Sequence, residues 1–188
     1  MSQPIKTAGW QKVYNTDEIN SINHHIESLN IDKTKDIPAS KADGTITKNI
    51  STVTPIPYHL LKHLISGLVK EAYQATNLNF GYTTFEKYGH EMCNFNIYKS
   101  SDSYHWHMDG SNSDAFDVKC TLLINLSTEP YKGGEFQLNL GTEIVDIPLM
   151  LEPGSAFMFK SYILHRVKPV TSGTRKTLTV FINGPKFQ

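Results

Sequence analysis

The chain has 188 residues, of which 39% are hydrophobic, and this is enough to form one domain with a substantial core. Lys and Arg together number 18, and so do Asp and Glu, so the formal net charge is zero. This balance argues against broad electrostatic capture of nucleic acid or of an anionic membrane, and we expect neither as a partner.

The sequence shows no sign of export or of membrane insertion. The first 15 residues lack the apolar stretch of a secretory signal, and no window approaches the roughly 18 apolar residues of a membrane span. Cys93 and Cys120 lie in strand-like hydrophobic runs, where we expect two buried, reduced thiols. A soluble cytoplasmic protein is the expectation.

Two helices are predicted in the first part of the chain. Asn15–Glu18 combines a capping residue with an acidic first turn, and apolar residues then recur at helical spacing at Ile19, Ile22, Ile26 and Leu29. A second helix is predicted from about 57 to 76, where the leucines, isoleucine and valine form a broad apolar stripe. Between the helices, residues 32–50 are polar and contain Pro and Gly, which predicts a long loop.

After Leu78 the sequence changes to short runs rich in aromatic and β-branched residues, separated by turn signals and without helices between them. This texture predicts a mainly β fold with N-terminal helices, namely an antiparallel sandwich or jelly roll with the helices packed on one outer face. We expect a single domain over 1–188, with helical support at about 1–78 and the jelly-roll core at about 79–188. The predicted strands lie in 80–88, 92–98, 103–109, 118–126, 134–140, 143–151, 155–161 and 177–183.

His107, Asp109 and His165 form the strongest candidate for a metal site. Residues two apart on a strand share a face, so His107 and Asp109 can chelate one ion together, and His165 would join them from a late strand. Two histidines and one carboxylate leave up to half of an octahedral sphere open, as in non-haem iron(II) oxygenases. The alternative is an ordinary hydrogen-bonded His–Asp pair. His105 is predicted on the same face, as a competing ligand or part of the substrate pocket.

Arg175 is a candidate anchor for a carboxylate, which an arginine can hold through two parallel hydrogen bonds. Thr177 lies on the same strand face and could add its hydroxyl. Tyr98 belongs to a polar strand face that is typical of a pocket lining. The alternative for Arg175 is a surface position in a basic turn.

Four segments resemble the iron(II)/2-oxoglutarate-dependent dioxygenases, most closely the prolyl-hydroxylase-like branch with its small PKHD-type hydroxylases. These segments are YKSSDSYHWHMDGS, YKGGEFQLN, PGSAFMF and LHRVKPVTSGTRKTLTVFING. The resemblance covers about residues 80–188. It implies a double-stranded β-helix in which His107, Asp109 and His165 bind Fe(II), Arg175 binds the distal carboxylate of 2-oxoglutarate, and Tyr98 contacts the same molecule. It further implies that Gly133-Gly134 is a structural turn.

The function implied by this resemblance is hydroxylation of a peptide or protein side chain, with proline as one candidate, and release of succinate and CO2. Fe(II), 2-oxoglutarate and dioxygen are the expected reactants, and ascorbate is a further candidate cofactor. Phe181 stands where the nucleic-acid demethylase branch usually carries a second arginine, which counts against a demethylase.

Two alternatives stay open at the level of sequence. The same scaffold could hydroxylate a free amino acid or another small metabolite. A cupin-like metal- or carbohydrate-binding barrel without oxygenase activity is the other, but it predicts a Glu after the histidine pair, and residues 108–128 contain none. It also leaves Arg175 unexplained.

Overall fold

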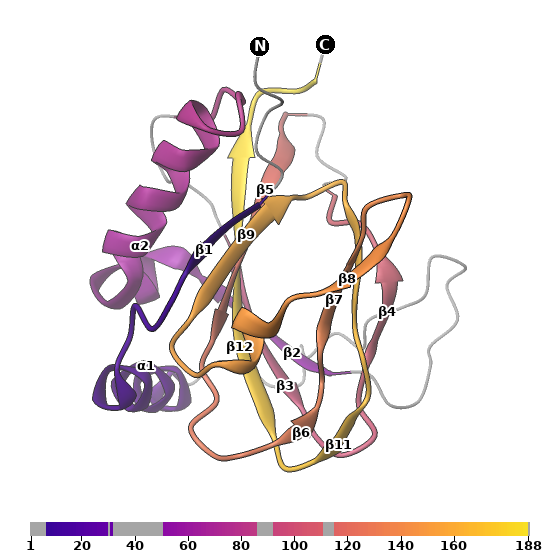
Figure 1. Cartoon of the computed structure of the whole chain (residues 1–188). Helices are drawn as coiled ribbons and strands as arrows, with labels where there is room; N and C mark the ends of the chain where they lie inside the picture. Colours follow the sequence, from indigo (N-terminus) through magenta and orange to yellow (C-terminus); the bar gives the residue numbers. More distant parts are fainter. Residues whose placement is uncertain (1–6, 30, 32–50, 86–91, 111–114, 188) are drawn as a thin grey trace.

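Two antiparallel β-sheets face each other and form a jelly roll, in a computed structural model that describes residues 7–29, 31, 51–85, 92–110 and 115–187 (Figure 1). The larger sheet has the order β1 (Thr7–Trp10), β9 (Ala156–Lys160), β5 (Asp117–Asn125), β12 (Arg175–Gly184), β3 (Met92–Tyr98) and β2 (Thr52–Pro57). The smaller sheet has the order β4 (Tyr104–His107), β10 (Leu164–Val167), β7 (Phe136–Asn139) and β8 (Ile144–Asp146). The predicted fold class is confirmed.

Three short elements complete the strand region. β6 (Lys132–Gly133) pairs with β11 (Val170–Ser172), and η2 (Pro148–Leu151) is a 3-10 turn after β8. The Gly133-Gly134 turn that follows β6 has positive φ angles of 74° and 71°. Glycine adopts this left-handed conformation without the steric cost of a Cβ, so the predicted turn requires these residues.

Both helices, α1 (Thr16–Ser28) and α2 (Tyr58–Leu78), lie on the outer face of the larger sheet (Figure 1). The larger sheet therefore has apolar side chains on both faces. Leu122 and Leu178 point to the helices, whereas Leu123 and Phe157 point to the smaller sheet. This alternation follows from the two-residue period of a strand and positions one face of β3, β5 and β12 over the space between the sheets.

The predicted start of α1 is confirmed. The Asn15 side chain accepts a hydrogen bond from the Glu18 N–H at 3.0 Å, and the Glu18 carboxylate accepts one from the Asn15 N–H at 2.7 Å. This reciprocal capping box satisfies two backbone donors that have no partner within the helix. Cys93 and Cys120 are buried thiols and not a disulfide, as predicted.

Two predicted strands differ from the structure, and two edge strands were missed. Residues 80–85 form no strand, and 86–88 lie outside the described residues, as does the predicted loop 32–50. The run 143–151 is a strand only at β8, because Pro148 begins η2. β1 and β2 were not predicted. β2 contains Pro55 and Pro57, and it lies at a sheet edge, where a missing N–H breaks no ladder bond. The N-terminal part thus supplies both edges of the larger sheet as well as the helices.

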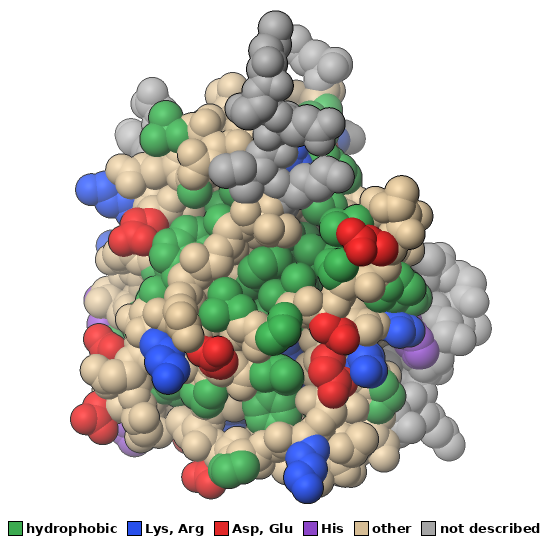
Figure 2. All heavy atoms as spheres, viewed as in Figure 1, with side chains coloured by type: hydrophobic (Ala, Val, Ile, Leu, Met, Phe, Trp, Pro, Cys, Tyr) green, Lys and Arg blue, Asp and Glu red, His purple; other side chains and the backbone are tan. Residues whose placement is uncertain are grey.

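The surface carries no continuous charge of one sign on the face shown in Figure 2. Acidic and basic side chains alternate around a group of hydrophobic side chains near its centre (Figure 2). Within the described part of the chain, neither helix has the length and apolar character that crossing a bilayer requires.

Replacing the cap tests how far α1 depends on it. Asn15→Ala should lower the free energy of unfolding by about 1 kcal/mol, because the Glu18 N–H loses its partner. Asn20→Ala, an exposed position inside the same helix, is the matched control and should be neutral or slightly stabilising, because alanine has the higher helix propensity. Denaturant unfolding of both variants measures the difference, and equal losses would contradict a capping role.

Candidate metal centre

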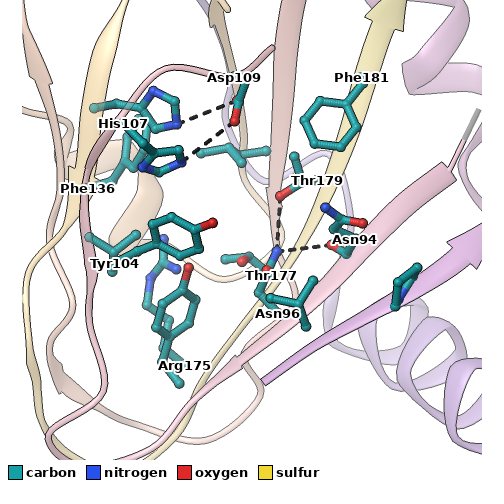
Figure 3. A pocket seen from close by; sticks show the side chains of 16 residues that line it. Asn94, Asn96, Tyr104, His107, Asp109, Phe136, Arg175, Thr177, Thr179 and Phe181 are labelled. Carbon is teal, nitrogen blue, oxygen red and sulfur yellow. Dashed lines mark hydrogen bonds and ion pairs between the residues drawn. The ribbon is translucent and has the colours of Figure 1, made fainter. Parts of the chain in front are cut away.

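A cavity between the two sheets is lined by the six residues that the sequence predicts to bind the metal or the carboxylate ligand (Figure 3). Its lining comes from β2, β3, β5 and β12 of the larger sheet and from β4, β7 and β10 of the smaller one. His107, Asp109 and His165 lie together. Arg175 lies in a part of the cavity away from His107 and Asp109 (Figure 3). The six predicted binding residues in the lining are Tyr98, His107, Asp109, His165, Arg175 and Thr177.

Strand pairing brings the two histidines together. His107 at the end of β4 lies directly opposite His165 in β10, although 57 residues separate them. Asp109 follows β4 by two residues, and its N–H donates to the Ser161 carbonyl at 2.9 Å. The His107 Nε2 atom is 3.6 Å from Asp109 Oδ1, and the His165 Nε2 atom is 3.5 Å from Asp109 Oδ2. One potential ligand atom from each residue lies within 4.8 Å of the others, which is close enough to hold one ion.

Backbone hydrogen bonds determine which nitrogen of each histidine faces the centre. The His107 Nδ1 atom lies 2.7 Å from the His105 carbonyl oxygen, and the His165 Nδ1 atom lies 2.8 Å from the Ile163 carbonyl oxygen. A carbonyl only accepts, so each Nδ1 carries a proton and each Nε2 atom faces the Asp109 carboxylate. When both Nε2 atoms present a lone pair, they converge with the carboxylate as the donor set of a metal site.

The electrostatic setting keeps His107 in the form that can bind a metal. Burial lowers the pKa of His107 to about 4, with a further lowering by His165, and the Asp109 carboxylate and the His105 carbonyl oppose this shift. His107 is therefore neutral near pH 7. His165 is 4% exposed, and its ring packs on Phe159 and Phe136 at centroid distances of 4.7 and 5.6 Å. These aromatic contacts hold the second imidazole in place.

A β-bulge corrects the predicted face of β4. Between Tyr104 and His107, β4 has one residue more than the opposing segment of β10, so Tyr104 and His107 share the cavity face. The ring centroids of Tyr104 and His107 are 4.1 Å apart. The prediction that His105 lies beside His107 is wrong, because the His105 side chain is exposed and only its carbonyl contributes. Strict alternation of side chains along the strand predicted Tyr104 on the face opposite His107, and therefore outside the site.

Arg175 is buried, so the alternative of a surface arginine is wrong. The residue is 1% exposed, and its Nε and Nη2 atoms have no hydrogen-bond partner among the described residues. Its guanidinium carbon lies 5.2 Å from the centroid of the Tyr98 ring, its neighbour across β3 and β12. A buried guanidinium with unsatisfied donors is costly unless an anion pairs with it. The arrangement fits a carboxylate ligand.

Tyr98 and Thr177 flank the arginine as the sequence predicted, and their contact with a bound molecule stays a prediction. Both residues are buried and line the cavity. Burial raises the pKa of the Tyr98 phenol, and the Arg175 cation opposes part of that shift. Burial also raises the pKa of Tyr104 to about 12, with smaller contributions from Tyr98 and Asp109. Both phenols are therefore protonated near pH 7 and able to donate a hydrogen bond.

Two further features of the site were not predicted. Thr121 in β5 donates a hydrogen bond to Asp109 Oδ2 at 2.6 Å, although its run of sequence is otherwise apolar. Gly134 leaves room for Arg175, because a Cβ at this position would lie 2.9 Å from the arginine Cδ atom. Thr121 could have been recognised from the sequence as a polar residue within an apolar strand. The contact between Gly134 and Arg175 could not, because it depends on tertiary packing.

Two histidines and one carboxylate on one wall of a jelly-roll cavity are the ligand set that is typical of mononuclear non-haem metal proteins. The family description "2OG-Fe(II) oxygenase superfamily" matches residues 93–183. A PKHD-type hydroxylase of Colwellia psychrerythraea is 39% identical over 66 residues, which are 35% of this chain and 28% of that protein. Residues 93–183 thus match the superfamily, and the PKHD-type relatives support the resemblance noted in the sequence over that segment.

Solved structures agree in fold. A prolyl-4-hydroxylase of Pseudomonas putida has a TM-score of 0.68 at 15% identity, covering 96% of this chain and 94% of its own. A prolyl hydroxylase of Trichoplax adhaerens, in complex with a peptide fragment of the hypoxia inducible factor, has a TM-score of 0.69 at 16% identity, covering 94% and 83%. At these identities the likeness shows the fold alone. The chain spans only 28% to 41% of the curated relatives it matches first.

The ligand assignment predicts the effect of replacing two neighbouring histidines. His107→Ala should weaken the binding of Co²⁺ or Mn²⁺ by at least about 100-fold, because one ligand of the centre is lost. His105→Ala is the matched control and should bind metal like the parent chain, because its backbone carbonyl is retained. Isothermal titration of the folded variants checks both, and a loss at His105 alone would contradict the bulged geometry.

Proposed function

We propose that the protein is an Fe(II)- and 2-oxoglutarate-dependent dioxygenase that hydroxylates a peptide or protein side chain, with proline as one candidate. One observation carries the proposal: a single cavity joins a converging set of metal ligands to a buried arginine whose Nε and Nη2 atoms have no hydrogen-bond partner among the described residues. A molecule that chelates the metal at one end and presents a carboxylate at the other would satisfy both. 2-Oxoglutarate has this construction.

The donor set suits ferrous iron. Two neutral imidazoles and one carboxylate would hold the ion and leave positions open for an exogenous chelate and for dioxygen. Bound Fe(II) with 2-oxoglutarate supplies an oxidative decarboxylation to succinate and CO2 that is coupled to insertion of oxygen into a C–H bond. Ascorbate, as a reductant that maintains ferrous iron, stays an expectation from the resemblance.

The chain itself contributes binding, orientation and shielding. Arg175 would hold the far carboxylate through paired hydrogen bonds, and Tyr98 and Thr177 lie close enough in the lining to add others. Phe136 and Leu123 are apolar parts of the lining. Such apolar walls lower the local dielectric constant, and this strengthens the electrostatic interactions beside them.

A polar part of the lining favours a second substrate class. The Asn96 amide donates to the Thr179 hydroxyl at 3.1 Å and to the Asn94 carbonyl at 3.0 Å, and all three residues line the cavity (Figure 3). A free amino acid or another small polar metabolite would find hydrogen-bonding groups there. The peptide class is supported instead by the PKHD-type relatives and by the peptide complex of the Trichoplax structure.

Turnover of 2-oxoglutarate tests the activity directly. Anaerobic protein with Fe(II) and 2-oxoglutarate should form succinate when oxygen is admitted, and His107→Ala should form none above background, because the metal is no longer held. Running the assay with proline-containing peptides, other peptides and free amino acids separates the two substrate classes by which of them stimulates succinate. Absence of succinate under all conditions, with a metal bound, would contradict the proposal.

Arg175→Ala should weaken 2-oxoglutarate binding to the metal-loaded protein by at least about 30-fold, which corresponds to ~2 kcal/mol, because the charge-assisted contact with the far carboxylate is lost. Arg166→Ala is the matched control. Arg166 stacks on Trp106 at 4.5 Å and bonds to Gln137, and it does not line the cavity. Anaerobic titration calorimetry measures both affinities, and an unchanged value in Arg175→Ala would show that the anchor lies elsewhere.

Gly134→Ala should also weaken 2-oxoglutarate binding, by roughly 10-fold or ~1.4 kcal/mol, because the added Cβ displaces the Arg175 side chain. Gly81→Ala is matched in backbone strain, since φ is 72° at Gly81 and 71° at Gly134, but it has open space around the Cβ. Both variants should lose about 1 kcal/mol of stability. Equal affinities for 2-oxoglutarate in the two variants would contradict a role of Gly134 beyond the turn.

A further inference from the structure

Thr121 is a buried hydroxyl whose bonding partner belongs to the metal centre. It lies in the middle of β5, opposite Phe159 in β9 and Phe181 in β12, and it is 0% exposed. A buried hydroxyl without a hydrogen bond costs about 1–3 kcal/mol. The Thr121 hydroxyl avoids this cost through its bond of 2.6 Å to Asp109 Oδ2.

The direction of this hydrogen bond is determined by chemistry. The ionised form of Asp109 that binds a metal carries no proton, so the threonine hydroxyl must be the donor. The distance of 2.6 Å lies in the range of charge-assisted O–H···O bonds, which are about twice as strong as neutral ones. One lone pair of Oδ2 is therefore occupied.

Without this bond the two carboxylate oxygens would be nearly equivalent. Oδ1 lies 3.6 Å from the His107 Nε2 atom, and Oδ2 lies 3.5 Å from the His165 Nε2 atom. The Asp109 backbone is already held by its bond to the Ser161 carbonyl, so rotation of the side chain is the freedom that remains. The hydroxyl of Thr121 removes that freedom and distinguishes the oxygens.

We propose that Thr121 is a positioning residue that restricts Asp109 to binding the metal through one oxygen, Oδ1. This inference rests on the proposed function, because an octahedral ion with three protein ligand atoms has room for a chelating keto acid and for dioxygen. A second oxygen from Asp109 would take one of those positions. Threonine thus keeps the coordination sphere open and orients the carboxylate.

Three variants of the full chain test the proposal without substrate, with Co²⁺ as the probe. Thr121→Val keeps the β-branched shape and removes the hydroxyl, so Co²⁺ affinity should fall roughly 10- to 100-fold, and the visible spectrum of the bound ion should change. Thr121→Ser keeps the hydroxyl and should restore both readouts to within about 3-fold of the parent affinity. Thr76→Val removes a buried hydroxyl that bonds the Ala72 carbonyl in α2 and does not line the cavity, and it should leave both unchanged.

The outcomes separate this inference from the proposed function. Wild-type Co²⁺ affinity and spectrum in folded Thr121→Val would overturn the role of Thr121 and leave the dioxygenase proposal standing. The same loss in Thr121→Ser as in Thr121→Val would overturn it too, because the hydroxyl is then not the cause. If Thr121→Val does not fold, Thr121→Ala and Thr121→Ser carry the comparison. Failure of the parent chain to bind any divalent metal would overturn the proposed function, and this inference with it.

Discussion

The site depends on two hydrogen bonds that orient the His107 and His165 rings. In both residues, Nδ1 donates to the carbonyl two residues earlier, so both Nε2 atoms point towards the Asp109 carboxylate. When both Nε2 atoms present lone pairs, three acceptors face one another and repel unless a cation lies between them. The backbone around β4 and β10 thus gives the two rings the orientation that a metal site needs.

A second group with incomplete hydrogen bonding lies in the same cavity. The Arg175 guanidinium is buried, and two of its nitrogen atoms have no partner among the described residues, whereas the Tyr98 ring offers it only a cation–π contact. Burying an unpaired charge costs several kcal/mol, and a fold selected for stability alone would not retain it. A cavity with a cation-binding end and an anion-binding end fits a ligand that chelates a metal at one end and carries a carboxylate at the other.

The surrounding layers make this possible. The helices cover the outer face of the larger sheet and complete a core that includes Ile56, Leu122 and Val180, so a large part of the apolar core lies away from the face that carries the site. The inner faces of β3 and β12 are then free to carry polar residues such as Asn96, Thr177 and Thr179. The Gly133-Gly134 turn serves both purposes, because it reverses the chain and leaves space for the arginine.

The sequence by itself determined the class of fold and the chemical character of the site. Strand periodicity and turn signals predicted most of the jelly roll, a capping residue predicted the start of α1, and the spacing of His107 and Asp109 indicated a chelating pair. These features are local, so a short stretch of chain contains the information. They also predicted His165 and Arg175, once the resemblance to known dioxygenases was taken into account.

Only the tertiary structure decided how the local pieces meet. The extra residue in β4 turns Tyr104 into the cavity and His105 out of it, and this bulge exists only in the pairing with β10. β1 has only four residues, and β2 contains two prolines. Neither sequence indicates a strand by itself, because each becomes one only by pairing with a neighbouring strand of the sheet. The bond from Thr121 to Asp109 joins β5 of the larger sheet to the segment that follows β4 of the smaller sheet. Contacts of this kind depend on register and packing between distant segments, and no pattern within either segment encodes them.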